Sequence, residues 1–223
     1  MALQTSFLKT VFAEFFGTFV LVTVVVGSGV MGTLMSPDDG IALLINTVST
    51  ILALWLLIVL LAPISGAHFN PVVSLVMFAR GDLSLKALLA YIANQVAGAV
   101  LGALTANAMF TTSFPQVSNN YREGFGTLLG EVIATAGLLL TILLLSDSGK
   151  AALIPVGVAA WIGSAYFFTS STSFANPAVT IGRIFTDSFS GIAAASAGPF
   201  ILAQLLGGFV GLGLFLALRV SKK

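Results

Sequence analysis

Residues 65–72 read Ser-Gly-Ala-His-Phe-Asn-Pro-Val, and residues 171–178 read Ser-Thr-Ser-Phe-Ala-Asn-Pro-Ala. Asparagine is a preferred N-cap and proline is favoured at the first helical position, so each Asn-Pro pair predicts the start of a helix. The segments that hold the pairs, Pro63–Arg80 and Ser170–Asp187, are too apolar for ordinary loops and too interrupted for membrane spans. The sequence therefore predicts two short helices that enter the membrane without crossing it.

The length of the first short helix suits this re-entrant position. From Asn70 to Ala79 it would extend about 15 Å, which is half of a bilayer core. Two such half-helices entering from opposite faces would meet near the midplane, N-terminus to N-terminus. Each N-terminus carries about half a positive charge, so we expect the pair to disfavour cations at that depth.

The rest of the chain has the composition of a membrane protein. Of its 223 residues, 57% are hydrophobic and 8% are charged, whereas soluble domains have about 25% charged residues. Six apolar stretches reach the roughly 20 residues that a span requires. They are Val11–Leu34, Ile41–Leu61, Ala87–Phe110, Phe125–Leu145, Ala151–Thr169 and Ala197–Leu218. The first is expected to be a retained span, because its apolar run is much longer than that of a signal peptide.

The same composition excludes several classes of function. Cysteine is absent, which rules out disulfides, thiolate catalysis and zinc–thiolate sites. A net charge of +1 provides no basic surface for nucleic acid. The sequence contains no nucleophile–base constellation, and we expect neither an enzyme nor a bound metal or cofactor.

The basic residues predict the orientation of the spans. Six spans place both termini on one side, together with the loops after the second and fourth spans. Most of the basic residues fall on that side: Lys9, Arg80, Lys86, Lys150, Arg219, Lys222 and Lys223. The other side has Arg122 and Arg183, with Asp38 and Asp39 in its first loop. By the positive-inside rule, we expect a multi-pass protein of the cell membrane with both termini in the cytoplasm.

The two halves of the chain repeat each other. The third and sixth spans each contain a glutamine, Gln95 or Gln204, followed by glycines three and seven positions later. Such a stripe of small residues allows helices to approach closely. The first and fourth spans each place one glutamate near their start, Glu14 and Glu131.

Three spans per half place the second copy upside down relative to the first, an arrangement found in many transporters and channels. We therefore predict an all-α membrane protein with six transmembrane helices and two re-entrant half-helices. Residues 1–223 would form one channel domain, with inverted repeats at about 7–110 and 121–219.

These features resemble the aquaporin and glycerol-facilitator family, which carries paired Asn-Pro-Ala signatures. The corresponding residues here are Asn70, Pro71 and Val72 in the first half and Asn176, Pro177 and Ala178 in the second. The resemblance covers the whole chain and implies a homotetramer in the lipid bilayer with one pore per subunit. It also implies that the two asparagines donate hydrogen bonds to small neutral solutes at mid-pore, in addition to capping their helices.

Glu14 and Glu131 allow two interpretations. Acidic residues inside a membrane are functional by default, and a proton-coupled carrier would use both of them. The resemblance instead implies that each carboxylate supports one of the two broken segments, Pro63–Arg80 and Ser170–Asp187. It would do so by accepting hydrogen bonds from backbone N–H groups, which hydrocarbon would leave unpaired. Their equivalent positions in the two repeats favour this supporting role.

One histidine and three large aromatic residues also have expected positions in the membrane. His68 resembles the family histidine at the cytoplasmic end of the pore. It either binds solute and responds to pH, or it lines the pore without a switching role. Trp55, Trp161 and Tyr166 are expected to anchor the protein at the membrane interface.

The family places four residues at its selectivity filter, the narrowest point of the pore. Counting from the signature asparagines gives Thr50, Ser164, Ser173 and Val179. Most relatives have an aromatic residue at the first position and an arginine at the last, and this chain has neither. We therefore expect a wider filter lined by three hydroxyls and one isopropyl group. The Asn-Pro-Ala-Val pattern is similar to that of a bacterial branch associated with arsenic resistance.

Arg183 lies one helical turn beyond Val179, on the same helix face. It is either a displaced charge at the pore mouth that helps to reject cations, or a side chain that extends to the membrane interface. We expect the second arrangement, with at most a small contribution to selectivity.

Together these patterns predict a passive channel without bond-making chemistry. The expected solutes are water, glycerol, urea and neutral metalloid hydroxides such as arsenous or antimonous acid. The alternative is a proton-coupled secondary carrier that uses Glu14 and Glu131.

Overall fold

The computed structural model describes residues 6–110 and 116–219, and it confirms the predicted all-α membrane architecture. Among these residues, six helical segments are long and apolar enough to cross a bilayer. They are α1 (Phe7–Met35), α2 (Asp39–Ser65), α4 (Leu85–Met109), α5 (Phe125–Asp147), α6 (Ile154–Phe168, preceded by a 3-10 turn at Ala151–Leu153) and α8 (Ala194–Leu218). They follow the six predicted spans in order.

Two short helices follow the Asn-Pro pairs, as predicted. They are α3 (Pro71–Ala79) and α7 (Pro177–Gly182). The asparagine before each helix is its N-cap, and the proline occupies the first helical position. The second helix is shorter than the first and passes into a 3-10 turn, Arg183–Phe185.

Helix α2 continues further than predicted. The predicted apolar stretch ended at Leu61, whereas the helix runs through Pro63 to Ser65, although proline cannot donate a backbone hydrogen bond. It ends at Gly66, which has a φ of 88° and donates its N–H to the carbonyl of Ala62. Glycine adopts this left-handed conformation without a steric penalty, so Gly66 rather than Pro63 determines the end of α2.

Glycine allows two equivalent helix pairs to pack closely. Helix α1 packs along α4, and α5 packs along α8. A Cβ atom at Gly102 of α4 would lie 2.4 Å from the carbonyl oxygen of Phe19 in α1. A Cβ atom at Gly211 of α8 would lie 2.5 Å from the carbonyl oxygen of Ala136 in α5. The backbones are therefore too close for any side chain at these positions, which accounts for the small-residue stripe in both halves.

This close packing predicts that Gly102→Ala destabilises the protein by about 1–3 kcal/mol, because the backbones of α1 and α4 must separate. The measurement is thermal unfolding of the purified protein in detergent. Gly213→Ala is a matched control in α8, since a Cβ atom there would meet nothing within 4 Å. Equal unfolding temperatures for the two variants would contradict this account of the α1–α4 contact.

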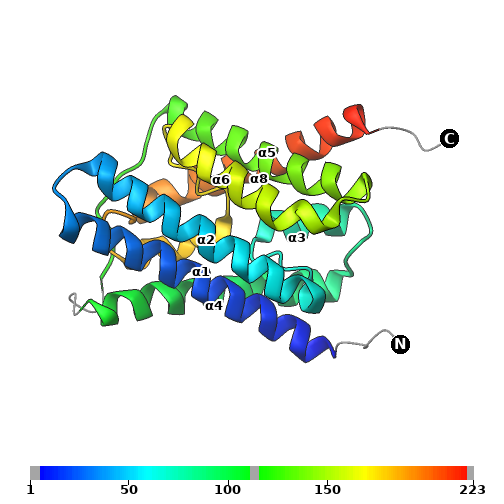
Figure 1. The fold of residues 1–223 in the computed structure, drawn as a ribbon, viewed down its shortest axis with the longest axis horizontal. Coiled ribbons are helices and arrows are strands. Elements are labelled where there is room, and N and C mark those ends of the chain that lie inside the picture. Colours follow the sequence, from blue (N-terminus) through cyan, green and yellow to red (C-terminus); the bar gives the residue numbers. More distant parts are fainter. Residues whose placement is uncertain (1–5, 111–115, 220–223) are drawn as a thin grey trace.

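The bundle has two distinct ends (Figure 1). Helix α1 begins and α8 ends at one of them, here called the terminal end, and the turn between α1 and α2 lies at the opposite end, here called the loop end. The start of the first helix and the end of the last helix share one end, as six spans require. Lys222 and Lys223, which contributed to the predicted orientation, lie outside the described residues.

Candidate functional site

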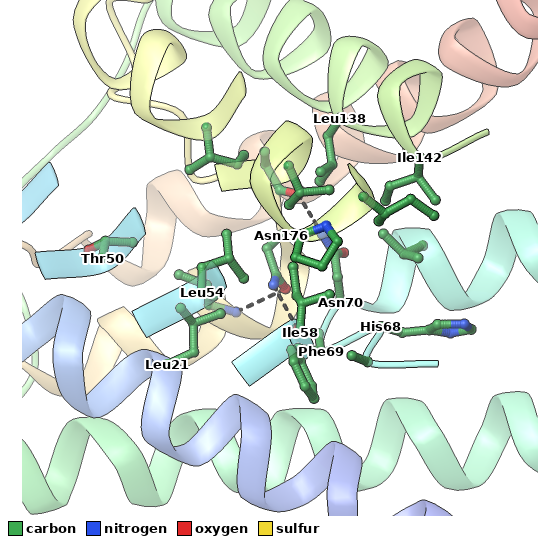
Figure 2. Close-up of a pocket in the computed structure, with 18 of the residues that line it drawn as sticks. Leu21, Thr50, Leu54, Ile58, His68, Phe69, Asn70, Leu138, Ile142 and Asn176 are labelled. Carbon is green, nitrogen blue, oxygen red and sulfur yellow. Dashed lines mark hydrogen bonds between the residues drawn. The ribbon is translucent and has the colours of Figure 1, made fainter. Parts of the chain in front are cut away.

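The two signature asparagines meet in the interior of the bundle (Figure 2). Asn70 donates from Nδ2 to the carbonyl oxygen of Ala175 at 2.8 Å, and Asn176 donates from Nδ2 to the carbonyl oxygen of Phe69 at 2.8 Å. Each asparagine also caps its own helix, because its Oδ1 accepts the backbone N–H two residues later. The crossed hydrogen bonds join the starts of α3 and α7, as expected for half-helices that meet N-terminus to N-terminus.

The backbone before each asparagine has an unusual and duplicated conformation. Ala67 and Phe69 have positive φ values of 52° and 48°, and Ser173 and Ala175 have values of 52° and 48°. Residues with side chains rarely adopt this left-handed region, and such strain persists only where the surroundings impose it. Both segments therefore need strong hydrogen-bond partners to hold them.

In the first half, Glu14 is that partner. Its carboxylate accepts the backbone N–H groups of His68 at 3.0 Å and Phe69 at 2.7 Å. It also accepts the Ser65 hydroxyl at 2.6 Å and Nε2 of Gln95 at 2.7 Å. A fully buried carboxylate is stable when several donors surround it, and here the donors belong to the broken segment or to the helix behind it.

Glu131 makes the equivalent contacts in the second half. It accepts the backbone N–H groups of Phe174 and Ala175, each at 2.8 Å, and Nε2 of Gln204 at 2.6 Å. Like Glu14, it has no exposed surface. Neither carboxylate lines either of the two cavities described below. The contacts place both glutamates behind the two interrupted segments, which agrees with a supporting role.

A cavity of about 310 Å³ extends through the bundle beside the two asparagines. We call it the pore cavity. Its walls are mostly apolar, and Leu54, Ile58, Leu138 and Ile142 contribute to them (Figure 2). Polar groups follow one another along it, from His68 past Asn70 and Asn176 to Thr50, and Ser173 also lines the cavity. The first signature's valine, Val72, is 1% exposed and packs behind this path rather than in it.

Three of the four predicted filter residues line the pore cavity. Thr50, Ser173 and Val179 do so, and each is almost completely buried. The prediction for Ser164 is wrong, because this side chain is exposed on the outer surface of α6 and lines neither cavity. The filter was expected to carry three hydroxyl groups, and the hydroxyl of Ser164 is not one of them.

Tyr166 occupies the pore-facing side of α6 instead. It was expected to anchor the protein at the membrane interface, but it is 4% exposed and lines the pore cavity. Its hydroxyl donates to Oγ1 of Thr50 at 3.5 Å. An aromatic residue therefore does lie near the filter, although the count from the second signature did not indicate it.

His68 lines the pore cavity toward the terminal end, on the opposite side of the asparagines from Thr50 (Figure 2). Its Nδ1 lies 3.0 Å from Oγ of Ser74, and its ring packs edge-on against Tyr91 at 5.3 Å. The histidine therefore lines the pore cavity beside Ser74 and Tyr91.

Arg183 does not extend to the membrane interface, which corrects the expected arrangement. Its side chain is 2% exposed, and Nε donates to the carbonyl oxygen of Ser190. Its guanidinium carbon lies 3.4 Å from the ring centroid of Phe174. The acceptor comes from the segment before α8, so α7 and that segment together turn the guanidinium inward.

A second cavity, of about 450 Å³, opens toward the loop end, and we call it the vestibule. Its lining is more polar and includes Asp39, Arg122, Glu123 and Arg183. Burial lowers the pKa of the Arg122 guanidinium, and the charge of Glu131 opposes that shift. Arginine remains protonated in proteins, so the vestibule contains two cations. Among the described residues, no cluster of three or more His, Cys, Asp or Glu side chains could hold a metal ion.

We use the term junction for the five residues at which the pore cavity approaches the vestibule. They are Thr50, Tyr166, Ser173, Val179 and Arg183. Ser173 follows Thr172, which lines the vestibule, and Arg183 lines both cavities.

Comparison with known proteins agrees with this geometry. Residues 1–171 match the model of the major intrinsic protein family. The chain is 44% identical over 202 residues to aquaglyceroporin AqpS of Rhizobium meliloti (strain 1021), covering 91% of this chain and 86% of that protein. It is 32% identical over 160 residues to human aquaporin-5, covering 69% of this chain and 58% of that protein.

The fold is also found in a solved structure. The X-ray structure of the aquaglyceroporin from Plasmodium falciparum superposes with a TM-score of 0.76, covering 94% of this chain and 96% of that one. Sequence identity is 21%, so this likeness concerns the fold alone.

Proposed function

Since the chain belongs to the major intrinsic protein family, a family of membrane channels, we propose that it conducts water, glycerol and other small uncharged solutes passively across the cell membrane. The observation that carries this proposal is a mostly apolar pore cavity that the two asparagines line between His68 and Thr50.

The two asparagine amides give this cavity its central donors. A side-chain amide has two N–H groups, and one N–H of each asparagine bonds the carbonyl of the opposite segment. Because both side chains also line the pore cavity, the second N–H of each can donate to a passing oxygen atom. A neutral hydroxyl solute exchanges water for such donors at little cost, whereas a cation meets donors and apolar walls where it needs acceptors.

The junction supports passage of solutes larger than water. Thr50, Ser173 and Val179 are small or medium-sized side chains, and the hydroxyls can pair with solute oxygens. Glycerol, urea and the neutral hydroxides arsenous and antimonous acid share this chemistry. We propose this solute class for the channel, with glycerol as its test member.

We further propose a homotetramer with cytoplasmic termini. Family membership supports the tetramer, and the excess of basic residues at the terminal end supports the orientation. The terminal end would then face the cytoplasm and the vestibule would open to the outside. Large apolar side chains are exposed on the outer faces of the described helices, as contact with lipid or neighbouring subunits requires.

Stopped-flow measurements on proteoliposomes test the proposed function. We expect water and glycerol fluxes well above those of protein-free liposomes, with a lower activation energy and no saturation. An imposed pH gradient should leave the glycerol flux unchanged, because no carboxylate of Glu14 or Glu131 faces the pore. A saturable glycerol flux that follows the pH gradient would support the proton-coupled carrier instead.

A further inference from the structure

Arg183 occupies a position that the proposed channel does not yet explain. Among the residues that the structure describes, it is the one that lines both the pore cavity and the vestibule. It directly follows the six residues of α7 and lies one turn beyond Val179. The Arg183 guanidinium therefore borders both cavities.

Three successive carbonyl groups hold the cations of the vestibule. Arg183 Nε donates to the Ser190 carbonyl oxygen. Arg122 donates from Nε to the Gly191 oxygen at 3.0 Å and from Nη2 to the Phe189 oxygen at 3.1 Å. Residues 189–191 thus use their carbonyl groups to orient two guanidinium groups, and they fix where the positive charge lies.

This segment is in turn attached to the first two helices. The Ser190 hydroxyl donates to the carbonyl oxygen of Val25 at 2.9 Å, and Asn46 donates from Nδ2 to the same oxygen at 2.7 Å. A Cβ atom at Gly29 would lie 2.0 Å from the Ser190 hydroxyl oxygen, so α1 passes unusually close at this point. Ser190 cannot shift easily, and the orientation of Arg183 follows from it.

Part of the guanidinium remains available to a solute. Nη1 of Arg183 is buried and has no hydrogen-bond partner among the described residues, and the same holds for Oγ of Ser173. Both side chains line the pore cavity. Buried polar groups are nearly always paired, so a donor and a hydroxyl left unpaired at one junction point to a ligand with oxygen atoms that can both accept and donate.

We propose that Arg183 is the specificity-determining residue of the junction: its fixed charge excludes cations, and its free Nη1 receives the oxygen of a neutral hydroxyl solute. This inference rests on the proposed channel function. It differs from the sequence-based expectation that Arg183 makes at most a small contribution to selectivity.

The surrounding charges support this assignment. The carboxylates of Asp39 and Glu123 also line the vestibule, but both residues are exposed, so water and salt screen their fields. Arg183 is 2% exposed and acts at close range on anything in the junction. A cation entering the pore therefore encounters the field of Arg183 with little compensation from Asp39 and Glu123.

The test measures sodium and proton leaks together with glycerol flux in the same proteoliposomes. Arg183→Met removes the charge and keeps much of the side-chain length, and Arg183→Lys restores the charge. We expect a cation leak about tenfold or more above wild type in Arg183→Met and a leak near wild type in Arg183→Lys. Arg80→Met is the matched control at the terminal end, where Arg80 pairs with Asp82 at 2.8 Å, and it should leak like wild type.

A second variant keeps the test informative if Arg183→Met fails to fold. Val179→Glu places a carboxylate one turn from an intact Arg183, and its field should offset that of the guanidinium. We expect Val179→Glu to leak cations more than Val179→Gln. The inference is overturned if Arg183→Met conducts glycerol with a cation leak no larger than that of wild type. It is equally overturned if Val179→Glu conducts glycerol with a cation leak no larger than that of Val179→Gln. Absence of glycerol flux in the wild type would instead refute the proposed function, whatever the leak.

Discussion

Arginine in place of Val179 should reduce glycerol flux by about tenfold or more, a barrier increase of at least ~1.4 kcal/mol, and reduce water flux much less. Val179 is 5% exposed and lines the pore cavity at the junction. A long side chain there would occupy the space that a three-carbon solute needs, while a single water molecule could still pass. Arg183 lies one turn away, so the two like charges would also push the new side chain toward the pore.

Stopped-flow light scattering with water and glycerol gradients measures both fluxes in one preparation. Val179→Met is the matched control, because it adds length without charge and separates the steric effect from the electrostatic one. If water and glycerol fluxes fell equally in a Val179→Arg protein that is still correctly assembled, Val179 would not line the narrow part of the path.

The half-helices could be predicted from sequence because their signals are local. An asparagine cap and a proline at the first helical position act within a few residues, and the structure places both pairs where helices begin. The supporting role of Glu14 and Glu131 could also be predicted from sequence, since their equivalent positions in the two repeats indicated a shared structural role.

The prediction that Ser164 of α6 lines the filter was wrong for a geometric reason. Ser164 and Tyr166 are two residues apart, and at 3.6 residues per turn that separation rotates a side chain by about 200° around the helix. A count from Asn176 passes through residues 169–176, where Thr172, Ser173 and Ala175 have positive φ values. Sequence spacing does not specify the path of such a segment. The count was therefore wrong by two residues, and it assigned the exposed Ser164 to the filter instead of the buried Tyr166.

The environment of Arg183 could not be predicted from the residues next to it in the sequence. Its position past the short helix suggested a side chain that reaches the membrane interface. The groups that draw it inward are the Ser190 carbonyl and the ring of Phe174, and Ser190 is held by Val25 on the first helix. The contact between Ser190 and Val25 joins segments 165 residues apart in the chain, and no local sequence pattern indicates it.

Glu131→Ala should have the largest effect on the fold. The substitution leaves the buried N–H groups of Phe174 and Ala175 without an acceptor and removes one of the two acceptors of the Gln204 amide. Each unpaired group costs about 1–3 kcal/mol. The left-handed residues before Asn176 would lose the partner that holds them. We expect little or no folded protein, as measured by yield and by size-exclusion chromatography in detergent.

Glu131→Gln distinguishes this structural role from proton transport. Glutamine keeps one oxygen that can accept, but its amide group faces donors where the second carboxylate oxygen stood. We therefore expect a folded protein that is less stable than wild type and still conducts glycerol, whereas Glu123→Gln at the exposed loop end should behave like wild type. Glycerol flux with and without a pH gradient is the decisive measurement. A folded Glu131→Gln protein that still passes water but has lost a glycerol flux driven by the pH gradient would make Glu131 part of a carrier. Retained glycerol flux, independent of the gradient, is the result that the hydrogen bonds of Glu131 to the broken segment lead us to expect.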